Sequence, residues 1–133
     1  MVPITRPFAI PVKGAKLTMV SYFASWCAAS KYWLPHDEEM RQKHAAAGLD
    51  VVGVANYDEA SQAQLEELVR ASGASFPVVA DEDRRILDAL PPNGWGRTII
   101  VVDAEGIVRL VHRGTREGAF EEVKAEVARL LAR

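Results

Sequence analysis

The chain has 133 residues, of which 49% are hydrophobic and 26% are charged, and its formal net charge at pH 7 is −2. This size and balance are typical of one soluble globular domain, so we expect a single domain over residues 1–133. Because the sequence shows no basic patch and no apolar run near the roughly 20 residues of a membrane span, it predicts no nucleic-acid partner and no membrane partner.

The first third of the chain predicts a strand and a helix after an irregular lead-in. Residues 1–16 carry three prolines and a glycine, which favour irregular structure. Residues 17–23 are apolar and β-favouring, so they predict a buried strand. A helix is expected over about residues 27–47, because Gly48 supplies a C-terminal stop, and Pro35 should kink it.

The middle of the chain predicts a second strand and a second helix. Residues 49–55 form another apolar, β-branched run. We expect Asp58 to cap the helix that follows and Gly73 to end it. Residues 76–80 predict a short extended segment, and residues 83–90 a helical turn before two prolines.

The last third predicts a β-hairpin and a closing helix. Residues 98–102 and 107–112 read as strands, joined by a four-residue loop whose Gly106 suits a positive φ. One apolar stripe at spacings of 3, 4 and 3 predicts the helix: Phe120, Val123, Val127 and Leu130. Parallel crossovers followed by an antiparallel pair imply an α/β fold, a mixed central sheet with helices on both faces.

Cys27 is the only cysteine, and it lies directly after the first predicted strand, at the start of the first predicted helix. Free N–H groups and the positive end of the helix dipole stabilise a thiolate there. Such thiols have pKa values of roughly 3.5–7.5, against about 8.5 for a free thiol. Ser30 occupies the place of the second cysteine of a C-x-x-C pair. The alternative is an inert, buried cysteine.

Four stretches carry a resemblance to a known family. Residues 19–27, MVSYFASWC, look like a strand ending in F-W-A-x-W-C, and Pro35 falls where that family kinks its first helix. Residues 49–54, LDVVGV, resemble its second strand, and residues 96–106, GRTIIVVDAEG, its G-x-P-T-x-x-x-x-D-x-x-G hairpin. The chain thus resembles the thioredoxin fold over about residues 17–131, in the branch of TlpA/ResA-type thiol–disulfide oxidoreductases and AhpC/TSA-like proteins.

Three positions depart from the pattern that the resemblance implies. Ser30 replaces the second cysteine, Arg97 replaces the cis-proline that faces the active-site sulfur, and Ser21 aligns with the buried acid of thioredoxins. Without a second cysteine in the chain, the family's two-cysteine reduction cycle does not carry over.

The resemblance implies thiol–disulfide exchange, with Cys27 as the nucleophile that forms mixed disulfides with a protein or with glutathione. Ser30 is expected either to stabilise the thiolate by a hydrogen bond or only to cap the helix, and Arg97 either to favour the thiolate or to reach solvent. The candidate substrate-binding residues are Trp26, Trp95, Gly96 and Thr98. No bound cofactor is implied, and a monomer is expected.

Two other functions stay open at this point. A redox-silent module that binds a protein partner in a Trp-lined groove fits both Ser30 and Arg97. A one-cysteine peroxidase is less consistent with the sequence. The peroxiredoxin pattern P-x-x-x-[TS]-x-x-C needs a hydroxyl residue and a proline where this chain has Ala24 and Val20.

Several residues are better explained by structure than by chemistry. Trp33 is expected to pack in the core. Four glutamates are predicted to lie on solvated helix faces: Glu38, Glu39, Glu66 and Glu67. His36 and His44 lie eight positions apart, too far for one chelate, so no metal site is predicted.

The compartment is not determined by this sequence. One cysteine cannot form an intrachain disulfide, so cysteine usage carries no information about redox compartment. The first residues lack the charged region and the long apolar core of a signal peptide. A cytoplasmic protein fits the sequence as written, and a periplasmic or other extracytoplasmic one fits if a signal segment was removed.

Overall fold

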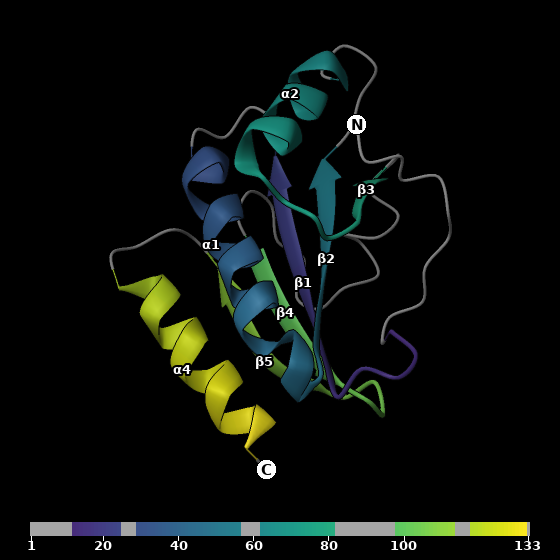
Figure 1. Ribbon diagram of the computed structural model, residues 1–133, viewed down its shortest axis with the longest axis vertical. Helices are drawn as coiled ribbons and strands as arrows, with labels where there is room; N and C mark the ends of the chain where they lie inside the picture. The colour runs from purple at the N-terminus through teal and green to yellow at the C-terminus, as the bar shows by residue number, and fades with distance from the viewer. Residues whose placement is uncertain (1–11, 25–28, 57–61, 82–97, 114–117, 133) are drawn as a thin grey trace.

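The structure of the chain, a computed structural model, describes residues 12–24, 29–56, 62–81, 98–113 and 118–132. Its helices and strands follow the predicted order (Figure 1). They are β1 (Leu17–Ala24), α1 (Ala29–His44), the 3₁₀-helix η1 (Ala45–Ala47), β2 (Leu49–Asn56), α2 (Gln62–Ser72), β3 (Val78–Asp81), β4 (Thr98–Asp103), β5 (Val108–Arg113) and α4 (Ala119–Leu131).

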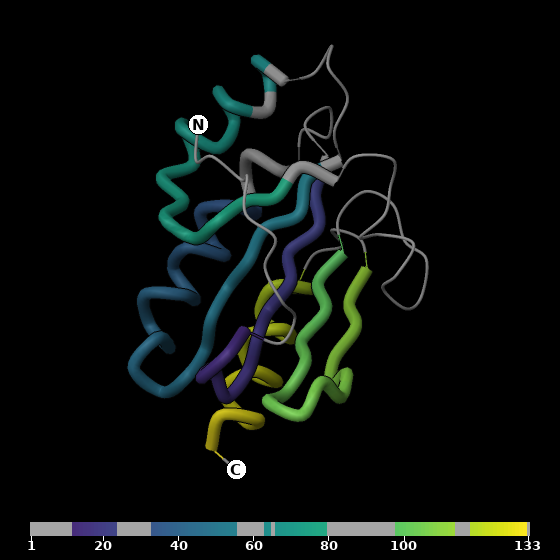
Figure 2. The backbone as a smooth tube through the Cα atoms, turned by 90° about the vertical axis from the view of Figure 1, so that its right-hand side faces the viewer, coloured from purple at the N-terminus to yellow at the C-terminus, as the bar shows by residue number. Residues whose placement is uncertain are grey.

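The strands form one mixed sheet in the order β3-β2-β1-β4-β5. β1 pairs with β2 in parallel and β2 with β3 in parallel, whereas β4 runs antiparallel to both β1 and β5. In Figure 2 the β4–β5 hairpin lies on the side of the sheet away from β3. The predicted mixed sheet is therefore confirmed, and β1 is its central strand.

One face of the sheet is covered by α1, α2 and α4, which share a single apolar core with it (Figure 1). Alternate residues of β1 face this core, among them Met19 and Phe23, because successive side chains of a strand point to opposite faces. The predicted stripe of α4 is confirmed in full: Phe120, Val123, Val127 and Leu130 are all buried.

The opposite face of the sheet carries a second, smaller cluster of buried residues. Its members are Val20, Tyr22, Val52, Val54, Ile100 and Val102. Of the described residues outside the sheet, Val12 packs against this cluster. The helical turn predicted for residues 83–90 lies outside the described residues, so the described helices cover one face and the expectation of helices on both faces stays a prediction.

The β4–β5 hairpin closes as predicted, through residues 103–106. Gly106 adopts a φ of 83°, and its N–H donates to the carbonyl oxygen of Asp103 at 3.0 Å. The Asp103 carboxylate accepts hydrogen bonds from the backbone N–H groups of Ile107 and Glu105 and from the Arg109 side chain. These bonds, that from Ile107 above all, hold the pKa of Asp103 below its usual value.

The helix stops were also predicted at the right positions. α1 continues into η1, and Gly48 ends the helical segment with a φ of 108°. A Cβ at Gly48 would lie 2.8 Å from the Cβ of Lys16, so both the backbone conformation and the close approach require glycine. Gly73 ends α2 with a φ of 74°, whereas its predicted cap, Asp58, lies outside the described residues.

Candidate functional site

The segment that holds Cys27 is bracketed by two described elements. β1 ends at Ala24 and α1 begins at Ala29, so the chain passes from the central strand into the helix within four residues, 25–28. Trp26 and Cys27 belong to that segment and lie outside the described residues. Ser30 lies in the first turn of α1, as the sequence predicts.

The start of α1 is electrostatically suited to an anion. Its first turn contains no acidic residue that would neutralise the positive end of the helix dipole. Its last turn carries Arg41, Lys43 and His44, which match the negative end. A thiol placed next to this helix start is therefore stabilised in its ionised form.

The start of β4 lies at the same end of the sheet. Thr98, its first residue, pairs with Tyr22 of β1, two residues before β1 ends. Thr98 is only 2% exposed, and among the described residues its Oγ1 is a buried atom with no hydrogen-bond partner. The predicted site residues Trp95, Gly96 and Arg97 directly precede Thr98 and lie outside the described residues.

A buried carboxylate lies between β1 and α1, which the sequence analysis did not identify. Ser21 Oγ donates a 2.6 Å hydrogen bond to Asp37 Oδ2, and both residues are fully buried. Ser21 thus occupies the strand position that the resemblance assigns to an acid, and its partner is an acid from the helix. The helical spacing from Trp33 and Leu34 to Asp37 was the available signal, because it places a polar residue on the apolar stripe of α1.

Glu38 corrects one prediction, since it does not lie on a solvated helix face. Its side chain is buried and accepts hydrogen bonds from Arg41 and Gln42 of its own helix, and from the N–H and hydroxyl of Ser75. Burial raises the pKa of Glu38, but these bonds, that from Arg41 first, outweigh it and lower the pKa to about 2. Glu39 and Glu67 are exposed, as predicted.

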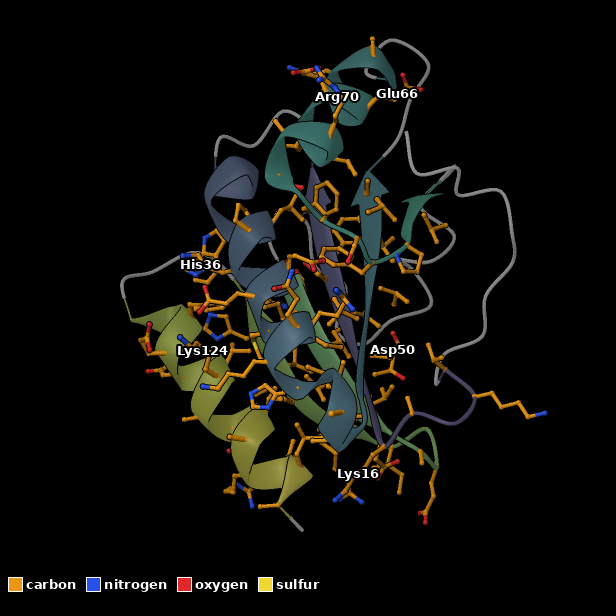
Figure 3. The ribbon with its side chains drawn as sticks, viewed as in Figure 1. Lys16, His36, Asp50, Glu66, Arg70 and Lys124 are labelled. Atoms are coloured by element: carbon orange, nitrogen blue, oxygen red, sulfur yellow. The ribbon has the colours of Figure 1, made fainter. Side chains whose placement is uncertain are left out.

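Trp33 packs in the core, which confirms its predicted structural role. Its ring lies 5.3 Å from the ring of Phe120 on α4, and the His36 ring lies 4.3 Å from the same phenylalanine. Lys124 Nζ lies 5.2 Å from the centre of the Phe120 ring. Figure 3 shows His36 and Lys124 along the contact between α1 and α4. This aromatic cluster packs α1 against α4.

The described residues offer no group of three or more His, Cys, Asp or Glu side chains that could hold a metal ion. In the same part of the chain, no helix is long and apolar enough to cross a membrane. A hollow of about 140 Å³ lies at the other end of the sheet, lined by Lys16, Leu17, Asp103, Arg109 and Leu130. It is separated from the Cys27 segment by the length of β1.

The mixed sheet, the helix that starts beside a single cysteine and the closing hairpin and helix define a protein with the thioredoxin fold. Residues 9–111 match the model of the AhpC/TSA family. The chain therefore belongs to the AhpC/TSA family.

Its curated relatives include thiol–disulfide oxidoreductases of bacilli. The chain is 30% identical to thiol-disulfide oxidoreductase ResA of Bacillus subtilis over 104 residues, which are 78% of this chain and 56% of that protein. It is 29% identical to sporulation thiol-disulfide oxidoreductase A of the same organism over 80 residues, which are 59% of this chain and 48% of that protein. The chain thus spans about half the length of these relatives.

Solved structures agree on the fold. A Chlorobium tepidum protein described as a DsbE thiol:disulfide interchange protein superimposes with a TM-score of 0.79 at 24% identity, over 90% of this chain and 82% of that one. StoA of Bacillus subtilis gives a TM-score of 0.68 at 21% identity, over 89% of this chain and 86% of that one.

Proposed function

We propose that this protein carries out thiol–disulfide exchange through Cys27 and forms a mixed disulfide with a protein or with glutathione. The observation that carries the proposal is the bracketing of the single cysteine by β1 and an α1 start without an acidic first turn. The named activity of the relatives, thiol–disulfide oxidoreductase, supports the same chemistry.

The exchange proceeds in two balanced steps. The Cys27 thiolate attacks one sulfur of a substrate disulfide, a Cys27–substrate bond forms, and the other substrate sulfur leaves as a thiolate. Because the chain has no second cysteine, an external thiol such as glutathione then attacks the substrate sulfur. That step releases Cys27 as a thiolate and leaves the external thiol in the new disulfide. No bound cofactor takes part in either step.

The remaining residues of the proposed site act around this sulfur. Ser30, in the first turn of α1, and Arg97 stabilise the thiolate. Trp26 and Trp95 shape an apolar groove, with Gly96 and Thr98 at its edge. An arginine in place of the family's cis-proline removes a rigid dock for substrate peptides, so substrate binding differs from that of the two-cysteine relatives.

The test is the rate of Cys27 alkylation by iodoacetamide as a function of pH. A midpoint below about 7 supports an activated thiolate, whereas a midpoint near 8.5 or no reaction in the folded protein contradicts it. Cys27→Ser serves as the control and should lack all exchange activity with glutathione disulfide. Ser30→Cys should gain insulin-reducing activity, because it restores the resolving thiol.

A redox-silent binding module is the second candidate function, and the observation that favours it is the replacement of the second cysteine by Ser30. If this function is right, the Cys27→Ser variant should bind the partner as tightly as the wild-type protein does. Exchange activity that depends on Cys27 distinguishes the two candidates.

A further inference from the structure

The strongest unassigned feature of the molecule is the outer edge of β5. Figure 2 shows β5 as the outermost strand on its side of the sheet, and within the described part of the chain only β4 pairs with it. Backbone N–H and C=O groups along such an edge are open to pairing with another chain. The pairing with β4 is regular from Leu110 to Arg113 and shifts between Val101 and Val102, so the Leu110–Arg113 end is the regular part of the edge.

Exposed hydrophobic side chains gather on this strand. Among the described residues, the large hydrophobic side chains that are exposed are Ile107 at 45%, Val108 at 36% and Val111 at 37%. All three lie in β5 or directly before it. Single exposed hydrophobic residues are ordinary on a protein surface, but a group of them in one place indicates an interaction surface.

The two valines belong to the face of the sheet that the described helices leave uncovered. Val111 pairs with Ile100 of β4 and Val108 pairs with Val102, and both β4 residues are members of the second, smaller buried cluster. On the other face of β5, Leu110 packs against the large core. A strand added to this edge would therefore place alternate side chains beside Val108 and Val111.

The charges of β5 determine which partner fits. The strand carries Arg109, His112 and Arg113 and no acidic residue. Arg109 is bound to the Asp103 carboxylate at 2.8 Å, whereas Arg113 is exposed and forms no ion pair with any described residue. Arg113 lies on the same face of the strand as Val111, so a complementary strand has an acid at the position next but one to an apolar residue.

The same charges disfavour a second copy of this chain as the partner. An antiparallel pairing of two β5 strands centred on Val111 would set Arg109 of one copy opposite Arg113 of the other. Like charges directly opposite each other on neighbouring strands are destabilising. No register within β5 offers either arginine a carboxylate, because the strand contains none.

We propose that the β5 edge binds an extended acidic segment of a partner protein, which adds to the sheet as a further strand. Backbone hydrogen bonds to the open edge supply affinity, and side chains of the segment supply specificity. Its apolar side chains pack on Val108 and Val111, and its carboxylate binds the Arg113 guanidinium. The segment needs no cysteine, so this site goes beyond the exchange function and does not depend on it.

The test is a fluorescence anisotropy titration with a fluorescein-labelled peptide that repeats Glu-Thr-Val-Thr twice. Wild-type protein should bind it saturably, and a peptide with lysine in place of glutamate at least about tenfold more weakly. Arg113→Glu should weaken binding of the acidic peptide about five- to tenfold and strengthen binding of the lysine peptide. Lys43→Glu is the matched control, since it makes the same charge change on α1, which packs on β1 and β2, and should alter neither affinity.

Two measurements on wild-type protein cover a variant that fails to fold. The acidic peptide is prepared N-methylated either at every Thr or at every Glu and Val. One of the two should lose binding and the other keep it, because one edge of an added strand faces β5 and N-methylation removes the donors of one edge. In the complex, amide hydrogen exchange should slow in β5 and stay unchanged in β3 at the opposite edge.

Three outcomes would overturn the proposal. The first is an acidic peptide that does not bind saturably, or that Arg113→Glu and Lys43→Glu weaken equally. The second is equal binding of the N-methylated and unmethylated peptides, which excludes strand addition. The third is a wild-type dimer in sedimentation velocity that Val111→Glu converts to a monomer, which makes a second copy the occupant of this edge. Each leaves the exchange function standing, because that function is tested at Cys27.

Discussion

Glu38 of α1 accepts two hydrogen bonds from Ser75, a residue 37 positions further along the chain, at 2.7 Å from its N–H and 2.9 Å from its hydroxyl. Ser75 lies between α2 and β3, so the contact fixes that connection against the first helix. Glu38 thus joins α1 to the connection between α2 and β3 through buried hydrogen bonds. It also makes the stability of the fold depend on pH.

We expect Glu38→Gln to destabilise the protein at pH 7 by up to about 3 kcal/mol, because the folded-state pKa is about 2 against 4.5 for the free group. The lowered pKa means that the stabilisation is present above about pH 4.5 and is lost as the pH falls toward 2. Urea unfolding of wild type and Glu38→Gln at pH 7, 5 and 3 measures this difference in the free energy of unfolding. Glu39→Gln, at an exposed position, is the control and should lose little. An equal loss in Glu38→Gln at pH 7 and pH 2.5 would contradict the assignment.

Gly53→Ala should destabilise the fold by about 1–3 kcal/mol through overpacking. A Cβ at this position of β2 would lie 3.1 Å from the Phe76 ring and 3.1 Å from a methyl group of Val78. Both neighbours are fully buried, so neither can move without disturbing the core. Thermal unfolding of Gly53→Ala alone and combined with Phe76→Leu tests this, because the smaller side chain should recover part of the loss. If Phe76→Leu recovers none of the lost stability, the strain in Gly53→Ala does not come from the Phe76 ring.

Phe120→Ala should cost about 3–5 kcal/mol, because the ring is the common contact of Trp33, His36 and Lys124 between α1 and α4. Phe120→Leu keeps most of the volume and should cost clearly less. Chemical denaturation of both variants gives the comparison. Equal losses would mean that the contact depends on aromatic geometry rather than on filled volume.

Local patterns in the sequence were sufficient to predict the elements of the fold. The apolar, β-favouring run of β1, the stripe of α4 and the glycines at positions 48, 73 and 106 each follow from constraints within a few residues. These constraints also gave the order of elements from which the mixed sheet was inferred. The match to known proteins then identified the family.

The sequence did not reveal the buried polar contacts, because they join distant positions. Glu38 has the composition and neighbours of a solvated glutamate, and only the approach of Ser75 in the folded chain buries it. The helical spacing of Asp37 from Trp33 and Leu34 could have indicated its burial, but its partner on β1, Ser21, follows only from the fold. The predicted roles of Cys27, Trp26, Trp95, Gly96 and Arg97 stay predictions, since these residues lie outside the described part of the chain.

Thr98→Val, at the start of β4, tests whether the Thr98 hydroxyl contributes to stability or to substrate binding. Valine has nearly the shape of threonine, and the change removes a buried hydroxyl that has no partner among the described residues. Removing this unpaired hydroxyl should stabilise the protein by about 1 kcal/mol. If Thr98 serves the substrate groove, the rate of exchange with glutathione disulfide should fall in the same variant.

Thr18→Val is the matched control for this change. Thr18 is fully buried on β1, and its Oγ1 accepts a 2.9 Å hydrogen bond from the N–H of Val12. Its removal leaves that N–H without its acceptor, so Thr18→Val should destabilise the protein by about 1–3 kcal/mol and leave the exchange rate unchanged. A loss of stability in Thr98→Val as large as that in Thr18→Val would show that the Thr98 hydroxyl is bonded in solution. The fold, rather than the substrate, would then account for the burial of this hydroxyl.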